Sequence, residues 1–217
     1  GGRDGASGRT EGPTDLALLV DACIEAHRAS GRPDPRRPWP DPLPDDRDLD
    51  AMAAMGPPDR PFGEGDAMVT HALADTPDDQ TQVPVGWVPG QGNLYLVGLP
   101  GSGTTTAALS VTLAAARSTS PDEMHVYALD FGTGDLEVLA GLPHTGAVIG
   151  ANDRERQARL ITWLREEAER RRGLRSPRTT EHRILLLVDG MATFRSEWED
   201  VISPVMEGMA RVFSEGP

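Results

Sequence analysis

Residues 94 to 106 read Leu94-Tyr95-Leu96-Val97-Gly98-Leu99-Pro100-Gly101-Ser102-Gly103-Thr104-Thr105-Thr106. The first four residues are apolar and favour a β-strand, the next six are rich in glycine, and the stretch from Thr105 to Arg117 is compatible with a helix. A strand, a glycine-rich loop and a helix in this order are the context that a phosphate-binding loop requires. The sequence therefore predicts such a loop, with an ordinary tight turn as the alternative.

The loop matches the pattern G-x-x-x-x-G-K-[ST] at every position but one, because Thr104 stands in place of the lysine. Gly98, Gly101 and Gly103 keep the backbone open, and a side chain at these positions would block the approach of a phosphate to the loop N–H groups. The lysine charge is lost. A charge-assisted hydrogen bond is worth about 1.5–3 kcal/mol, so we expect nucleotide affinity to fall roughly ten- to a hundredfold. Hydrolysis should fall further, because charge builds up on the γ-phosphate during transfer.

A second element is the apolar run from Ile184 that ends in Asp189. A buried parallel strand places such a carboxylate at the C-terminal edge of the sheet, beside the loop, where it can hold a Mg²⁺-bound water. Active ATPases of this architecture carry an acidic residue next, and Gly190 stands there instead. Both departures predict a site that holds nucleotide and hydrolyses it poorly.

Beyond residue 90 strands and helices alternate, which predicts a parallel sheet with covering helices. We expect strands at Met124 to Leu129 and Ile184 to Asp189, with a brief apolar run at Ala147 to Ile149. The helices expected are Leu136 to Leu139, Asp153 to Arg172 behind a capping box of Asn152 and Glu155, and a last one from Pro204. The fold class is therefore α/β, a P-loop NTPase (RecA/FtsK-like) sheet. Such domains add strands after the carboxylate strand, so we expect an incomplete domain.

The first 60 residues differ from the remainder. We expect a flexible lead, a helix from Asp15 to Ser30 with Cys23 on its buried face, and a proline-rich connector without regular structure at residues 33–62. Trp39 should dock on a surface. Residues 72–87 should form one or two edge strands leading into the core sheet. The resulting division is 1–60 for the lead, helix and connector, and 61–217 for a degenerate ATPase domain.

Composition limits the classes of molecule that the chain is expected to bind. The formal net charge is −13, and all 21 cations are arginine; duplex DNA, which is held by clustered cations, is a poor fit. The arginines between Arg154 and Arg183 fit a solvated face with paired carboxylates better than a DNA-facing stripe. We expect Asp130 to be a turn residue that makes local hydrogen bonds, and His144 to have a structural role. No apolar run is long enough to span a membrane, and one cysteine allows no intrachain disulfide, so we expect a soluble piece in a reducing compartment.

Several motifs together resemble the FtsK/SpoIIIE-type ATPase modules. They are Asp75-x-Pro77-x-x-Gln80-x-Gln82-x-Pro84 ahead of Trp87, Gly98-Leu99-Pro100-Gly101-Ser102-Gly103, Tyr127-Ala128-Leu129-Asp130-Phe131-Gly132 with Leu142-Pro143-His144, and Leu186-Leu187-Val188-Asp189-Gly190. Within that family the sequence is most similar to the EccC ATPases of type VII (ESX) secretion. The proline-rich segment around Trp39 resembles the linkers between their modules, so the resemblance covers about residues 14–217.

The resemblance implies the cytoplasmic part of a membrane-anchored motor that acts with other ATPase modules of the same chain or ring and exports WXG100-like proteins through a membrane secretion complex. Carried over by position, Gly98, Gly101, Ser102, Gly103, Thr104, Thr105 and Thr106 would bind ATP, and Thr105 and Asp189 would serve Mg²⁺. The departures at Thr104 and Gly190 place the chain among degenerate modules used in regulation, assembly or substrate docking. A docking module without nucleotide and an FtsK-like DNA translocase module are the alternatives.

Overall fold

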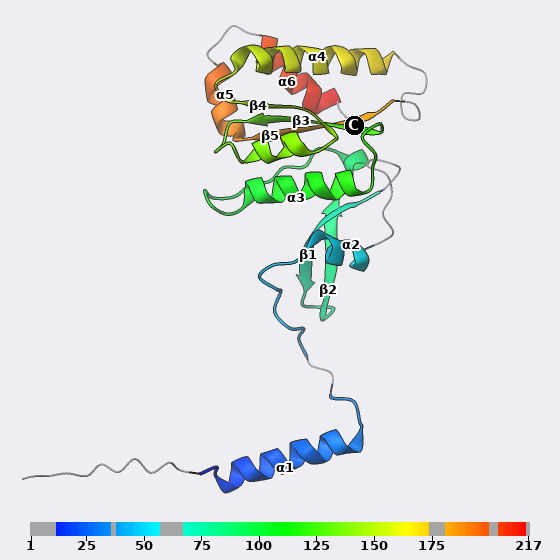
Figure 1. The fold of residues 1–217 in the computed structure, drawn as a ribbon, viewed down its shortest axis with the longest axis vertical. Coiled ribbons are helices and arrows are strands. Elements are labelled where there is room, and N and C mark those ends of the chain that lie inside the picture. Colours follow the sequence, from blue (N-terminus) through cyan, green and yellow to red (C-terminus); the bar gives the residue numbers. More distant parts are fainter. Residues whose placement is uncertain (1–11, 36–37, 57–66, 174–180, 200–203, 216–217) are drawn as a thin grey trace, which may run out of the picture. The chain divides into compact units, whose positions relative to one another are not determined.

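The computed structural model describes residues 12–35, 38–56, 67–173, 181–199 and 204–215. The chain divides into two compact units, Gly1–Trp39 and Pro40–Pro217, and each is described by itself (Figure 1). The second unit carries every strand and all but one of the helices assigned to the described residues.

The first unit contains helix α1, Asp15–Ser30. The Thr14 side chain accepts a hydrogen bond from the Ala17 amide at 3.2 Å, and Gly31 closes the helix in the left-handed conformation, as expected. One prediction for this unit was wrong, because Cys23 is exposed and no residue of α1 is buried. Trp39, the last residue of this unit, is 70% exposed.

The second unit begins with a small hairpin subdomain. Helix α2, Leu49–Met55, precedes strands β1, Val69–Thr76, and β2, Thr81–Trp87, which pair antiparallel. The proline-rich connector therefore does contain regular structure, since Asp48 caps α2 by accepting a hydrogen bond from Ala51. The two strands exist as predicted. They form a sheet of their own, however, and do not extend the main sheet.

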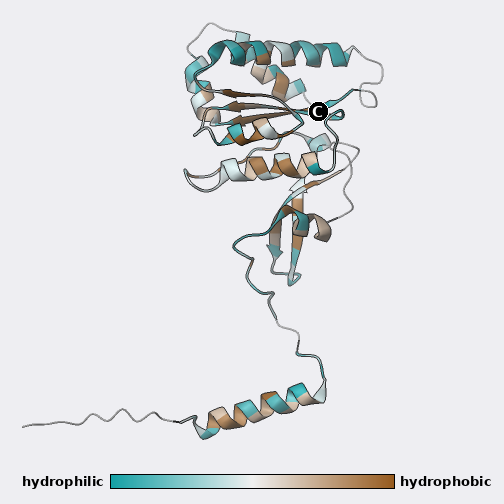
Figure 2. Cartoon of the chain, viewed as in Figure 1, coloured by the Kyte–Doolittle hydropathy of each residue, from teal (hydrophilic) through white to brown (hydrophobic). Residues whose placement is uncertain are grey.

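The main sheet has three parallel strands in the order β4-β3-β5. They are β3, Met124–Asp130, β4, Thr145–Gly150, and β5, Arg183–Asp189. Figure 2 shows these strands in apolar colours beside the largely hydrophilic helix α4. Both faces are covered, which explains why β5 reads as a continuous apolar run. Leu185 and Leu187 pack in one core cluster with helix α3, whereas Ile184, Leu186 and Val188 pack in the other.

The covering elements follow from the same pattern. Helix α3, Thr104–Arg117, lies on one face, and α4, Arg154–Arg172, and α6, Pro204–Glu215, lie together on the other (Figure 1). Short elements complete the unit: η1, Pro89–Gln91, η2, Asp135–Gly141, and α5, Met191–Glu199. Helix α5 was not predicted. Asp153, and not Asn152, caps α4, because its side chain accepts the hydrogen bond from the Arg156 amide.

One prediction at the centre of the fold was wrong. The run from Leu94 to Val97 is not assigned as a strand, and among the described strands β5 pairs with β3 alone. Val97 is 94% exposed and Leu99 80% exposed. A strand requires a partner for its backbone hydrogen bonds, and the described residues place none beside this run. Nor does any helix among the described ranges combine the length and the apolar composition that crossing a bilayer demands.

Candidate phosphate-binding site

The glycine-rich loop lies at the N-terminus of α3. Gly101 and Gly103 have positive φ angles of 80° and 85°, which residues with a side chain rarely adopt. Gly98 has a different reason to be glycine, because a Cβ there would lie 2.0 Å from the Ser102 hydroxyl. The loop thus folds back on itself at Gly98 and turns into the helix at Gly103.

The first turn of α3 is open to an anion. The Ala107 amide donates to the Gly103 carbonyl at 2.8 Å, so the N–H groups of Thr104, Thr105 and Thr106 precede the first intrahelical bond. No side chain among the described residues caps this helix, and the loop residues before it are exposed. The helix dipole adds partial positive charge at this point. These amides are the groups that a phosphate at this turn would contact.

The structure joins the two predicted halves of the site. The Thr105 hydroxyl donates a hydrogen bond to Asp189 Oδ2 at 2.9 Å, across 84 residues of sequence. Asp189 also accepts a hydrogen bond from its neighbour's amide, Gly190, at 3.0 Å. The sequence expectation that α3 begins beside the aspartate at the end of β5 is thus confirmed.

Gly190 occupies a position that no other residue type fits. Its φ angle is +71°, and a Cβ there would lie 2.8 Å from both the carbonyl carbon and the carbonyl oxygen of Phe131. Backbone atoms do not move aside as a flexible side chain does. In this backbone conformation, the position where active relatives of this architecture are expected to carry a catalytic acid leaves no room for a side chain.

These residues fit a nucleotide with Mg²⁺. The first turn of α3 offers backbone donors, while Thr105 and Asp189 are a hydroxyl and a carboxylate in contact. Mg²⁺ is commonly held by one or two carboxylates together with waters and phosphate oxygens. Among the described residues no group of three or more His, Cys, Asp or Glu side chains gathers at metal-binding distance. A metal at Asp189 would thus depend on the phosphates for its remaining ligands.

Two other residues prove structural, as the sequence indicated. Asp130 accepts hydrogen bonds from the amides of Gly132, Gly134 and Leu136 at 3.0, 3.3 and 2.9 Å, so it fixes the turn after β3. His144 is buried, and its Nε2 lies 2.7 Å from the Thr119 carbonyl oxygen.

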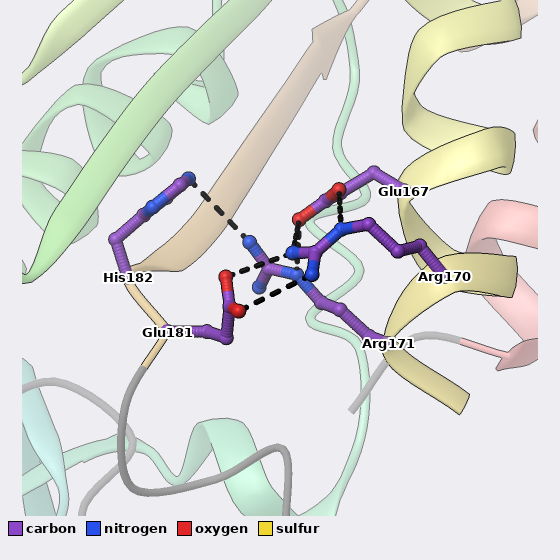
Figure 3. Close-up of polar contacts among 5 residues, drawn as sticks. All are labelled: Glu167, Arg170, Arg171, Glu181 and His182. Carbon is purple, nitrogen blue, oxygen red and sulfur yellow. Dashed lines mark hydrogen bonds and ion pairs between the residues drawn. The ribbon is translucent and has the colours of Figure 1, made fainter. Parts of the chain in front are cut away.

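A second polar cluster lies at the opposite end of β5, and Figure 3 shows its five members. Arg170 contacts Glu167 and Glu181 at 2.7 and 2.8 Å, and Arg171 contacts Glu167 at 2.6 Å. The hydrogen bond from Arg170, helped by Arg171, lowers the pKa of Glu167 to about 2. Burial, with the nearby His125 ring, lowers the pKa of His182. The cluster ties the end of α4 to the start of β5, which confirms that the arginines pair with carboxylates.

A parallel sheet with covering helices, a glycine loop at a helix N-terminus and a strand-end aspartate beside it define the P-loop NTPase fold. The FtsK/SpoIIIE family model matches residues 57–216, and the chain belongs to this family. The curated relatives are type VII secretion proteins. EssC of Staphylococcus aureus strain NCTC 8325 is 28% identical over 170 residues, which cover 76% of this chain and 11% of EssC. YukB of Bacillus subtilis strain 168 is 33% identical over 112 residues, 51% of this chain and 8% of YukB. The chain thus spans a small part of these relatives.

Solved structures show the same fold. The cytoplasmic domain of the Thermomonospora curvata type VII secretion ATPase EccC superposes with a TM-score of 0.69 at 22% identity, over 89% of this chain and 26% of that one. A structure of ATPases 2 and 3 of the same EccC, in complex with a signal sequence peptide, gives a TM-score of 0.56 at 24% identity, over 76% of this chain and 35% of that one.

Proposed function

We propose that this chain provides an ATP-binding module of a type VII secretion motor that holds nucleotide weakly and hydrolyses it little. The proposal rests on a site that keeps some features of a phosphate-binding loop and lacks others. The loop glycines and the Thr105–Asp189 contact are kept, whereas Thr104 replaces the lysine and the backbone around Gly190 leaves no room for a catalytic acid.

In this proposal the loop binds the phosphates, and two side chains bind the metal. The amides of the loop and of the first turn of α3 bind the phosphate oxygens, and Thr105 with Asp189 holds Mg²⁺ through its ligands. Bound Mg²⁺ supplies charge neutralisation between the phosphates. Without a lysine, less of the charge that develops during phosphoryl transfer is balanced, and without an acid at position 190 no side chain there orients the attacking water.

The biological role follows from the family. As a module with little turnover, the chain serves regulation, assembly or substrate docking in protein export, next to other ATPase modules in the cytoplasmic part of a membrane-anchored protein. WXG100-like proteins are the proposed substrates. The similarity to EssC and EccC, and the signal sequence peptide bound in an EccC structure, support this assignment.

Calorimetry with ATP and Mg²⁺ tests the proposal. We expect saturable binding that weakens when Mg²⁺ is removed, with phosphate release no faster than in Gly103→Asp. That variant places a carboxylate in the loop at a residue with positive φ, so it should lose binding. Absence of ATP binding at millimolar nucleotide would contradict the proposal and favour a docking module without nucleotide. Salt-sensitive binding of duplex DNA would instead favour a translocase module.

A further inference from the structure

Two side-chain contacts of different chemistry join the last turn of α4 to the start of β5 (Figure 3). Arg170 Nη2 lies 2.8 Å from Glu181 Oε2, and both groups keep their charges throughout the neutral pH range. Arg171 Nη2 lies 3.4 Å from Nε2 of His182, and histidine is the residue whose charge changes in that range. The first contact is therefore insensitive to pH near neutrality, whereas the second responds to it.

The contact with Arg171 assigns the protonation state of His182. A guanidinium group carries hydrogen-bond donors and no acceptor, so the ring nitrogen that faces it has to accept. Nε2 of His182 therefore carries a lone pair, and the proton of the neutral imidazole is on Nδ1. A proton added to Nε2 would place one N–H group against another, and the hydrogen bond from Arg171 would be lost.

A second imidazole ring adds to the preference for a neutral His182. The His125 ring of β3 stacks on the His182 ring, with 3.9 Å between the centroids and 33° between the planes. The parallel pairing of β3 with β5 brings the two side chains together, because His125 stands opposite Ile184 in the register. Two imidazolium ions at this distance repel each other. Protonation of one ring therefore disfavours protonation of the other.

The charged groups around His182 act in opposite directions. Arg171 and His125 disfavour the imidazolium ion, whereas Glu167 and Glu181 favour it. Both carboxylates already have partners, since Arg171 and Arg170 contact Glu167 at 2.6 and 2.7 Å and Arg170 also contacts Glu181. Burial acts in the same direction as Arg171 and His125. Together they hold the pKa of His182 below its ordinary value.

Other titratable or charged side chains near this end of the sheet do not reverse the balance. Tyr127, on the same face of β3 as His125, stays neutral because burial raises its pKa. Glu215 of α6 forms an ion pair with Arg172 at 2.9 Å. Glu123 accepts hydrogen bonds from Ser120. Arg183 follows His182 directly, and successive side chains of a strand point to opposite faces.

We propose that the Arg171–His182 contact is a pH-sensitive tie, which holds the last turn of α4 on the start of β5 only while His182 is neutral. In acid, a proton from solvent adds to Nε2, and Arg171 keeps Glu167 of its own helix as its partner. The Arg170–Glu181 ion pair remains. The last turn of α4 therefore loosens while the fold persists. The proposal does not rest on nucleotide binding.

The direction of the effect follows from proton linkage. The pKa of His182 is lower in the folded chain than in the unfolded chain, where it is about 6.5, so the opened chain takes up the proton first. The contribution of His182 to stability is complete above pH about 6.5 and is lost as pH falls from there toward the folded-state pKa. The pKa values of Glu167 and Glu181 are lowered, so these groups stay ionised across this window.

Nitrogen-15 NMR tests the protonation state. At pH 7.5 we expect His182 Nε2 to show the chemical shift of a bare ring nitrogen and Nδ1 that of a protonated one. His182 should titrate at a lower pH than the same residue in the urea-unfolded chain. Arg171→Met should raise the pKa of His182, because a positive neighbour is removed. A protonated Nε2 at pH 7.5, or equal titration in the folded and unfolded chains, would overturn the proposal.

Hydrogen exchange tests the loosening of α4. Between pH 7.5 and 5.5, after correction for intrinsic exchange rates, the amides of residues 168–172 should lose about three- to tenfold in protection. His182→Gln should remove this loss, because the glutamine amide accepts a hydrogen bond and does not titrate. His71→Gln, in the β1–β2 hairpin, is the matched control and should keep it. Equal protection at the two pH values, or a loss that survives in His182→Gln, would contradict the proposal.

The other contact provides a variant that separates the two ties. Glu181→Gln weakens the ion pair with Arg170, and Glu181 is ionised at both pH values. We therefore expect protection of residues 168–172 to fall at pH 7.5 as well as at pH 5.5, with the further loss in acid retained. A variant that no longer loses protection in acid would assign the pH response to Glu181 and overturn the proposal.

Discussion

Asp130 and Asp189 end neighbouring parallel strands and stand opposite each other in register. Their carboxylates nevertheless have different partners. Asp130 is buried and accepts hydrogen bonds from three amides of the turn that follows it. Asp189 is less buried, and it accepts the hydroxyl of Thr105 from the start of α3. One aspartate holds its own turn, and the other reaches across to the phosphate-binding loop.

The difference shows that the residues after a strand decide what its terminal carboxylate does. After Asp130, the turn through Gly132 and Gly134 brings amides back over the carboxylate. After Asp189, Gly190 turns away with a positive φ and leads into α5. Gly132 lies between the two: a Cβ there would be 2.5 Å from Asp189 Oδ2 and 3.5 Å from Asp130 Oδ1. Its lack of a side chain keeps space for Asp189.

The largest effect expected from this comparison is on stability. Asp130→Ala leaves three amides without their acceptor and should lower the free energy of unfolding by about 4 kcal/mol, since hydrogen bonds to charged groups are worth about 1.5–3 kcal/mol each and are not additive. Urea unfolding measures this. Asp189→Ala should cost less than about 1 kcal/mol while lowering Mg²⁺-dependent nucleotide binding. Equal destabilisation by the two variants would remove the distinction. Asp122→Ala, at an exposed turn, is the control.

The next effect concerns the residue after Asp189. Gly190→Glu restores an acidic side chain where active members of the architecture are expected to have one, but at a positive φ and against the Phe131 backbone. We expect a loss of about 2 to 3 kcal/mol of stability and no gain in phosphate release. Met191→Glu, one residue further and exposed at the surface, controls for the added charge. A folded Gly190→Glu protein with measurable turnover would show that the position is open after all.

A smaller effect is expected at the loop itself. Thr104→Lys adds an ammonium group at the N-terminus of α3, and ATP affinity should rise about tenfold, which is about 1.4 kcal/mol. Fluorescence titration with a labelled nucleotide measures the change. Thr106→Lys, two positions on in the same exposed turn, carries the same charge without the lysine position of the motif. If both variants raised affinity equally, the gain would come from net charge alone.

The smallest effect is expected at Glu167, a carboxylate far from both Asp130 and Asp189, and it concerns the stability of the fold in acid. The pKa of Glu167 is about 2 because Arg170 and Arg171 donate to it, so its folded-state pKa lies below that of the unfolded chain. Such a group contributes stability above pH about 4.5 that is lost as pH falls toward 2. Glu167→Gln should therefore flatten the decline of unfolding free energy in this window. An unchanged acid profile would show that Glu167 contributes nothing to it.

Much of the fold was predictable because its signals are local. The apolar runs ending in Asp130 and Asp189 indicated buried parallel strands, and Thr14 and Gly31 marked the ends of α1. Helix α2 and the exposed Cys23 were missed. The proline content hid a short helix between prolines, and burial of a helix face depends on what packs against it, which periodicity does not reveal.

The candidate site divides in the same way. Gly98, Gly101, Gly103, Thr105 and Asp189 were predicted from spacing and residue type, and the structure brings Thr105 and Asp189 into contact. The sequence predicted a strand from Leu94 to Val97, and the structure assigns none there. A run of residues that favours a strand does not say whether a neighbouring strand is present to receive its hydrogen bonds.

The amino-acid sequence by itself determined the family, the glycine-rich loop and the threonine in place of the motif lysine, since each depends on residue identity within a short window. Only the tertiary structure decided that Asp130 accepts hydrogen bonds from its own turn while Asp189 contacts Thr105, and that the backbone leaves no room for a side chain at Gly190. These properties depend on distances between atoms that are remote in sequence, and packing alone sets such distances.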